Sequence, residues 1–138
     1  MSNRKNTDRF LQAFDAWQTK TGVAYDKALR QTALGVFRSV IQRTPVKTGR
    51  ARGNWQATMQ KPAQGTLARL DASGQIAIGE ATQAVLGGQG DVFLLTNNLE
   101  YIQGLEYGRS GQAPQGMVRV TLEQFEQILR AAAQKETI

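Results

Sequence analysis

Few residues of this sequence could do chemistry, because the chain contains no cysteine and no histidine. Their absence removes thiolate nucleophiles, zinc sites built on cysteine, and the commonest general base and metal ligand. Among the other residues, the candidates that we consider are a pair of acids, Glu100 and Glu106, and a serine in a turn-rich segment, Ser110. Glycoside hydrolysis or acyl transfer would have to be built from these residues.

The two acids and the serine do not form a catalytic pattern. Glu100 and Glu106 are six positions apart on a short expected helix, whereas side chains that share a helix face are three or four apart. Ser110 has no histidine to activate it. We therefore expect no catalytic residue, no metal site and no cofactor, and we predict that the protein is not an enzyme.

A glycine cluster, Gly87-Gly88-Gln89-Gly90, could suggest nucleotide binding. Phosphate-binding glycines follow a strand and open a helix, so that the phosphate lies at the helix N-terminus. This cluster instead comes before the clearest strand of the chain. The context favours a plain turn.

Basic residues are concentrated in one part of the sequence. Residues 27–70 hold nine basic and no acidic side chains, whereas residues 71–138 hold four basic and eight acidic ones. A field of one sign favours contact with nucleic acid or with the acidic face of a neighbouring subunit, and a solvated basic face without a partner is the third interpretation. The nine residues are Lys27, Arg30, Arg38, Arg43, Lys47, Arg50, Arg52, Lys61 and Arg69.

Length and composition predict one folded domain over residues 1–138. A chain of 138 residues with 41% hydrophobic and 20% charged side chains is long enough to bury a core and too apolar to be disordered. The first residues lack the apolar stretch of a secretory signal, and no apolar run reaches the length that crosses a bilayer. We expect a protein made in the cytosol, with no membrane partner and no small-molecule substrate.

Helical periodicity dominates the N-terminal third of the chain. The apolar spacing predicts a helix over about residues 7–20, a break at Thr21-Gly22, and a longer helix over about 23–43 that ends before Pro45. The apolar residues that share a face of the first helix are Phe10, Leu11, Phe14 and Trp17.

Strands and shorter helices follow. Alternating side chains predict a strand over about 54–60, and the four consecutive apolar residues in Val92–Thr96 predict a strand covered on both faces at the centre of the sheet. A helix is expected after Ser73 up to Val85, a short one capped by Asn98 over about 99–107, and a final one over about 117–135. This order predicts an α+β domain, a small and mostly antiparallel sheet packed against two N-terminal helices and a C-terminal helix.

Two aromatic residues, Trp55 and Tyr101, lie beside turn-rich segments. Large amphipathic rings in such places serve either the core or contacts between chains. Both interpretations stay open for these two residues.

Three segments together resemble a known family. The stretch TPVKTGRARGNW at residues 44–55, the stretches LTNNLEY at 95–101 and LEYG at 105–108, and the stretch QAPQGMV at 112–118 resemble, in the same order, motifs of the tail-completion or minor tail proteins of lambda-like siphophages. The resemblance extends from about residue 20 to the end of the chain. The sequence departs from the family at Glu100, where many relatives have proline.

The resemblance implies a structural virion protein at the neck, where the finished tail joins the filled head. It implies a closed homo-oligomeric ring, a hexamer, around the DNA path, with neighbouring neck and tail proteins as partners and the genome close by. It implies localisation in the virion after assembly in the host cytoplasm, and no cofactor. Turn-rich loops and a polarised charge are compatible with contacts that close a ring.

These considerations predict two sets of site residues. The residues expected to contact neighbouring subunits or partner proteins are Thr48, Gly49, Arg50, Arg52, Trp55, Asn98, Tyr101, Glu106, Tyr107, Gly108, Gln112, Pro114, Gly116 and Met117. The basic residues that could line a DNA channel are Lys27, Arg30, Arg38, Arg43 and Lys47. A nucleic-acid-binding protein that uses the basic 27–70 segment is the alternative function, with a steep dependence on salt.

Overall fold

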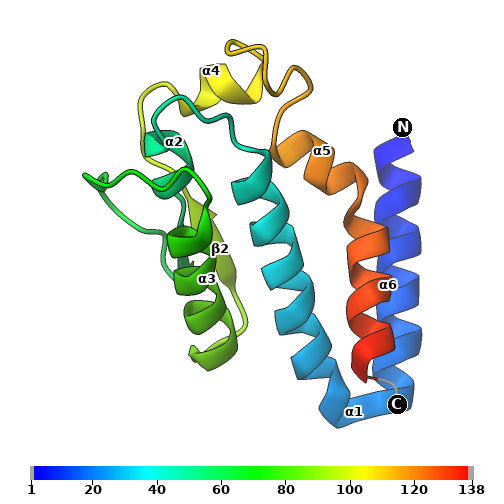
Figure 1. The fold of residues 1–138 in the computed structure, drawn as a ribbon. Helices are drawn as coiled ribbons and strands as arrows, with labels where there is room; N and C mark the ends of the chain where they lie inside the picture. Colours follow the sequence, from blue (N-terminus) through cyan, green and yellow to red (C-terminus); the bar gives the residue numbers. More distant parts are fainter. Residues whose placement is uncertain (1, 137–138) are drawn as a thin grey trace.

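The computed structural model describes the backbone of residues 2–136 and the side chains of residues 7–13 and 26–134. Phe14 and Trp17, expected on the apolar face of the first helix, therefore lie outside the described side chains. Figure 1 shows the arrangement of the elements along the chain.

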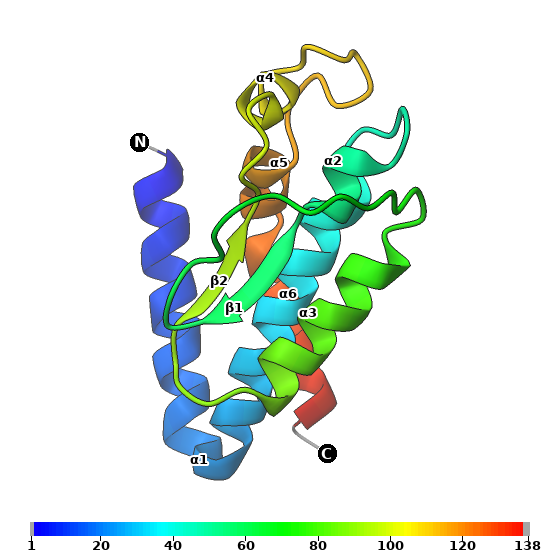
Figure 2. The same cartoon turned by 90° about the vertical axis from the view of Figure 1, so that its left-hand side faces the viewer.

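Helix α1 (Ser2–Arg43) contains both of the expected N-terminal helices. At the expected break, Thr21-Gly22, the backbone stays helical. Figures 1 and 2 show instead that the blue ribbon turns back, so that the first section of α1 stands apart from the cyan last section. The helix ends at Arg43, as Pro45 predicted.

A short helix, α2 (Arg50–Gly53), leads into the sheet. Strand β1 (Gln56–Met59) pairs with β2 (Phe93–Thr96) in antiparallel register, with Ala57 opposite Leu95. The expectation that β2 is a central strand covered on both faces is wrong, because the sheet of the described chain has two strands and every β2 residue stays half-buried. The helix α3 (Gln75–Gly87) between the strands agrees with the sequence prediction.

The C-terminal third forms α4 (Ile102–Glu106), α5 (Val118–Glu123) and α6 (Phe125–Glu136). Asn98 does not cap α4: its side-chain amide donates to the carbonyl oxygens of Ala63 and Gly65. The expected continuous last helix is interrupted at Gln124. Val118 and Leu122 of α5 lie on the surface.

The last section of α1 lies between two layers, with α3 and the sheet on one side and α5 and α6 on the other (Figures 1 and 2). Phe10, near the start of α1, packs edge to face on Phe125 of α6, with ring centroids 4.5 Å apart. The α+β class and the small antiparallel sheet are confirmed. α6 packs on α1, and α3 is the helix that packs most closely on β1.

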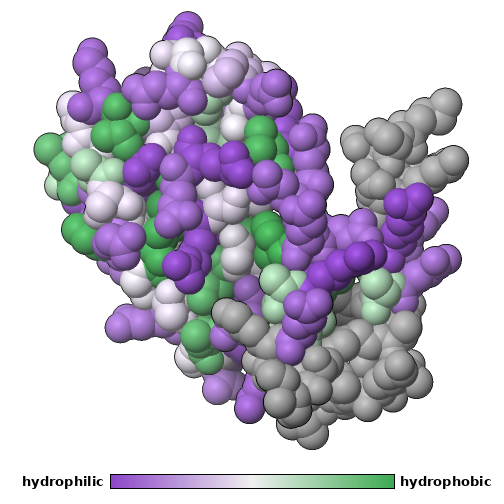
Figure 3. All heavy atoms as spheres, turned by 45° about the vertical axis from the view of Figure 1, so that its right-hand side comes forward, coloured by the Kyte–Doolittle hydropathy of each residue, from purple (hydrophilic) through white to green (hydrophobic). Residues whose placement is uncertain are grey.

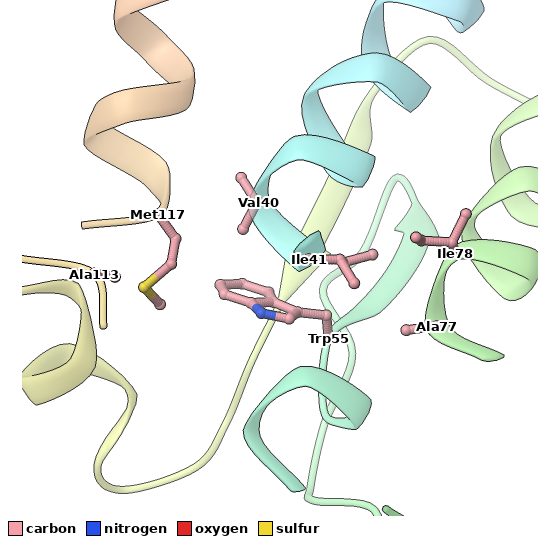
Figure 4. Packing of buried hydrophobic residues seen from close by; sticks show 7 residues of the cluster. All are labelled: Val40, Ile41, Trp55, Ala77, Ile78, Ala113 and Met117. Atoms are coloured by element: carbon pink, nitrogen blue, oxygen red, sulfur yellow. The ribbon is translucent and has the colours of Figure 1, made fainter. Parts of the chain in front are cut away.

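Two apolar clusters along the last section of α1 form the core. One consists of Leu34, Phe37, Ala81 and Val85, with Ala57, Phe93 and Leu95 packed against it. The other, drawn in Figure 4, consists of Val40, Ile41, Trp55, Ala77, Ile78, Ala113 and Met117. No helix in the described part of the chain is long and apolar enough to span a bilayer.

Candidate functional site

Trp55 belongs to the core of the protomer. Its side chain is 6% exposed, and Figure 4 shows its ring between Val40 and Ile41 of α1. The indole Nε1 donates to Oγ1 of Thr44 over 2.7 Å, and this hydroxyl donates in turn to the carbonyl oxygen of Val40. The burial of the ring and of its polar nitrogen corrects the prediction that Trp55 contacts a neighbouring subunit.

Arg52 closes the C-terminal end of α1. Its Nη2 donates to the carbonyl oxygens of Gln42 and Thr44, each over 2.8 Å, and its Nη1 donates to that of Ala72 over 2.8 Å. Carbonyl oxygens at a helix end have no partner within the helix, so a guanidinium there satisfies them. Burial lowers the pKa of Arg52, although the charge of Asp71 acts in the opposite direction. The side chain is partly buried and engaged within the protomer, and its predicted role in partner contact stays a prediction.

Gly49 is a buried point of close approach between two loops. Its backbone has φ 92°, and its carbonyl oxygen accepts a hydrogen bond from the backbone N–H of Asp71 over 3.0 Å. A Cβ atom added at Gly49 would lie 2.6 Å from the backbone nitrogen of Ala72. Gly49 is thus required for folding, and its predicted role in partner contact is corrected.

Asp71 completes this arrangement and was not expected from the sequence. Its carboxylate is 4% exposed and accepts a hydrogen bond from the backbone N–H of Ala77, in the first turn of α3, over 2.9 Å. We call Thr44, Gly49, Arg52, Trp55 and Asp71 the loop clamp. It joins the end of α1, the segment before β1 and the start of α3.

Glu106 is the N-terminal cap of α5. Its carboxylate accepts hydrogen bonds from the backbone N–H groups of Met117, Val118 and Arg119 over 2.9, 2.9 and 3.0 Å. Burial raises the pKa of Glu106, but these bonds and one from the Arg119 side chain together outweigh burial and lower it. Glu106 therefore holds α5 within its own protomer, and its predicted role in partner contact stays a prediction.

Met117 and Gly116 are also inside the protomer. Met117 is fully buried in the cluster with Trp55, and Gly116 is packed against the main chain of Glu106, where an added Cβ would lie 2.7 Å from the carbonyl oxygen. Their predicted role in contacts between subunits is corrected. The GMV part of the motif instead directs the chain from the loop into α5.

Next to this cap, three side chains of α5 and that of Tyr107, which follows α4, form an exposed surface. We call it the α5 surface. The guanidinium of Arg119 lies over the ring of Tyr107, 4.7 Å from its centroid, and its Nε donates to Oε2 of Glu106 over 3.1 Å. Tyr107 is 73% exposed, and Val118 and Leu122 are 38% and 56% exposed. Positions 118, 119 and 122 share one side of α5. The members of the α5 surface are Tyr107, Val118, Arg119 and Leu122.

Such a surface can bind another protein. Tyrosine and arginine are the residues on which binding energy concentrates, and side chains that are already fixed lose little conformational entropy when a partner docks. Figure 3 shows hydrophobic side chains, in green, reaching the surface in separate patches among hydrophilic ones in purple. Of the α5 surface, the sequence prediction had named only Tyr107 as a contact residue. No local pattern could find Arg119, because its position depends on Glu106 and Tyr107 in another segment.

The remaining predicted contact residues fall into two groups. Gln112 is tied to its own protomer: its side chain accepts from the backbone N–H of Val46 over 2.9 Å and donates to the Val46 carbonyl oxygen over 3.1 Å. Gly108 approaches the backbone of Pro114. Besides Gln112, which is itself exposed, the predicted contact residues that are exposed are Thr48, Arg50, Asn98, Tyr101, Tyr107 and Pro114.

Several of the basic residues are engaged within the fold. Arg30 donates to the carbonyl oxygens of Val85 and Gly88 at the end of α3, which corrects its assignment to a DNA channel. Arg69 donates to the Gly53 carbonyl oxygen and forms an ion pair with Glu80. Five basic residues of the 27–70 segment are exposed and have side chains that form no hydrogen bond or ion pair within the described chain: Lys27, Arg38, Lys47, Arg50 and Lys61.

Among the described residues, no group of three or more Asp, Glu, His or Cys side chains is placed to hold a metal ion. Comparisons with protein-family models, with curated proteins and with solved structures find no match to this chain.

Proposed function

We propose that this chain is a structural, non-enzymatic subunit of a tailed-phage virion. It acts in tail completion or head-to-tail joining and forms a closed ring with copies of itself around the DNA path. Its partners are its own copies and the adjoining neck and tail proteins. The resemblance of residues 44–55, 95–108 and 112–118 to tail-completion proteins motivates this proposal.

The α5 surface is the observation that supports an assembly function best. Its aromatic ring and its guanidinium are stacked and held by Glu106, and two apolar side chains extend the exposed area. A subunit that docks through this surface onto a different face of the next copy makes a head-to-tail contact, and such contacts close into rings when the rotation permits.

The mass of the purified protein in solution tests the proposed ring. We expect light scattering to show a closed multimer whose mass stays constant over a range of concentration. The sequence resemblance predicts six copies. A monomer at every concentration, or a mass that grows without limit, contradicts a closed ring of this chain.

Nucleic-acid binding through the basic segment is the second candidate, supported by the five exposed cations named above. Each phosphate that a protein neutralises releases counterions, so binding of this kind weakens steeply with salt. The same mass measurement with short duplex DNA, at low and at physiological salt, separates the two functions. Tight and salt-sensitive binding of the isolated subunit favours the second candidate.

A further inference from the structure

Two adjoining hollows lie along the C-terminal end of α1. The first, between α1 and the 112–116 loop, and the second, between α1 and α6, each have a volume of about 450 Å³. Gln42 and Arg43 line both, so the hollows meet at these residues. We call the combined feature the α1 groove. It is distinct from the α5 surface, none of whose four residues lines it.

The lining of the α1 groove is basic and amide-rich. Its charged side chains are Arg38, Arg43 and Arg52, and no carboxylate lines either hollow in the described chain. Arginine binds carboxylates with paired, charge-assisted hydrogen bonds, and glutamine amides supply further donors. The four glutamines of the lining are Gln42, Gln112, Gln115 and Gln124.

The arginines of the groove keep their charge available. Arg43 donates only to neutral oxygens, those of Ser39 over 3.1 Å and of Gln124 over 3.0 Å. Arg38 is exposed, and its side chain forms no hydrogen bond or ion pair within the described residues. Arg43 is thus positioned in advance, and no described carboxylate neutralises either charge. An incoming anion would supply the missing counter-charge.

The shape of the groove distinguishes between two kinds of anion. A DNA duplex presents phosphates along a wide surface, so its binding needs basic residues spread over a comparable face or an element that enters a groove of the duplex. Hollows of about 450 Å³ accept single side chains of an extended peptide. The apolar contribution of Ile128 and Val120 to the lining also suits the carbon chains of a peptide.

We propose that the α1 groove binds an extended acidic peptide segment of a partner protein, with Arg38 and Arg43 as the carboxylate-binding residues. Arg52 contributes its positive charge, while its hydrogen bonds to the carbonyl oxygens of Gln42, Thr44 and Ala72 are kept. The proposal does not depend on ring formation through the α5 surface, so either can fail without the other.

Fluorescence anisotropy with the full chain tests this proposal. The probes are a short labelled peptide of alternating glutamate and glycine, the same peptide with glutamine in place of glutamate, and a short labelled DNA duplex. We expect the glutamate peptide to bind and the glutamine peptide and the duplex to bind at least about tenfold more weakly. Tighter binding of the duplex than of the glutamate peptide overturns the proposal.

Substitutions locate the binding. Arg38→Gln should weaken peptide binding about tenfold without affecting folding, because Arg38 makes no bond within the described chain. The matched control is Arg50→Gln, which removes the same charge from an exposed position outside the groove. Equal affinity of the two variants overturns the proposal. Arg43→Gln should weaken binding as well, and its melting temperature shows whether the loss of the Gln124 bond matters.

Discussion

The loop clamp and the α5 surface come from two segments with equally distinctive sequences, yet they have opposite environments. In the clamp, Trp55 is 6% exposed and its polar atom is satisfied by Thr44. In the α5 surface, Tyr107 is 73% exposed and its ring is covered only on the side of Arg119. A distinctive motif can therefore serve packing within the protomer in one segment and provide an exposed contact surface in another.

The difference lies in where the hydrogen bonds go. The clamp uses its polar groups to join segments within the protomer, as when Asp71 and Arg52 satisfy the backbone at the ends of α3 and α1. At α5, Glu106 also satisfies the backbone, but it holds Arg119 at the surface at the same time. Changes in the clamp should therefore reduce stability, and changes in the α5 surface should reduce assembly.

The largest expected effect on stability is that of Trp55→Ala. The substitution leaves a cavity beside Val40 and Ile41 and removes the hydrogen bond that Trp55 donates to the Thr44 hydroxyl, and it should lower the free energy of unfolding by about 3–5 kcal/mol. Urea denaturation followed by circular dichroism measures it. A loss below about 1 kcal/mol would mean that the ring is not a core residue.

Gly49→Ala should have the next largest effect. An alanine at φ 92° has a strained backbone, and its Cβ would lie 2.6 Å from the backbone nitrogen of Ala72, which would have to move. Together these effects should lower the free energy of unfolding by about 2–4 kcal/mol. Gly65→Ala is the matched control, because Gly65 has φ 78° with nothing within 4 Å of its added Cβ. In the control, the free energy of unfolding should fall by only about 1 kcal/mol. Equal losses in the two variants would contradict the close packing at Gly49.

Glu106→Gln should have a smaller effect that depends on pH. Because the pKa of Glu106 is lower in the folded state, its carboxylate stabilises the protein above the unfolded-state pKa of about 4.3, and this contribution is lost as the pH falls through the folded-state pKa. We expect the variant to lose about 1–2 kcal/mol at neutral pH. The difference from the unsubstituted protein should shrink in acid, as thermal melts over a pH series would reveal. A difference that is constant with pH would argue against the cap.

The smallest expected effect on stability is that of Tyr107→Ala. An exposed ring with one stacked cation contributes less than about 1 kcal/mol to folding. The variant should therefore melt close to the unsubstituted protein while its assembled fraction falls, which light scattering on the same sample measures. A large drop in melting temperature would mean that Tyr107 stabilises the fold, as the loop clamp residues do.

Periodicity in the sequence predicted the elements that are built on local spacing. The second half of α1, α3, both strands and the antiparallel class follow from the repeat of apolar residues and from Pro45. The interruption at Gln124 did not follow from spacing. Thr121 is fully buried and bonds to Ser39 on α1, a tertiary contact that sets the position of α5 independently of α6.

The site was less predictable, because its bonds join distant segments. Arg30 and Val85 are 55 positions apart, and no local pattern indicates that this arginine closes α3 and is not free for DNA. Asp71 and Arg119 were missed for the same reason. The motif around Arg52 and Trp55 was predicted to contact partners, whereas in the structure these two residues hold together segments of one protomer.

The most direct test of the division between clamp and surface is the native mass spectrum of Leu122→Glu beside that of the unsubstituted protein. Leu122 is 56% exposed on the α5 surface, so a charge there should leave folding intact while opposing an apolar contact. The account predicts a closed ring for the unsubstituted protein and a folded monomer for the variant. An intact ring in Leu122→Glu would contradict the assignment of the α5 surface to assembly.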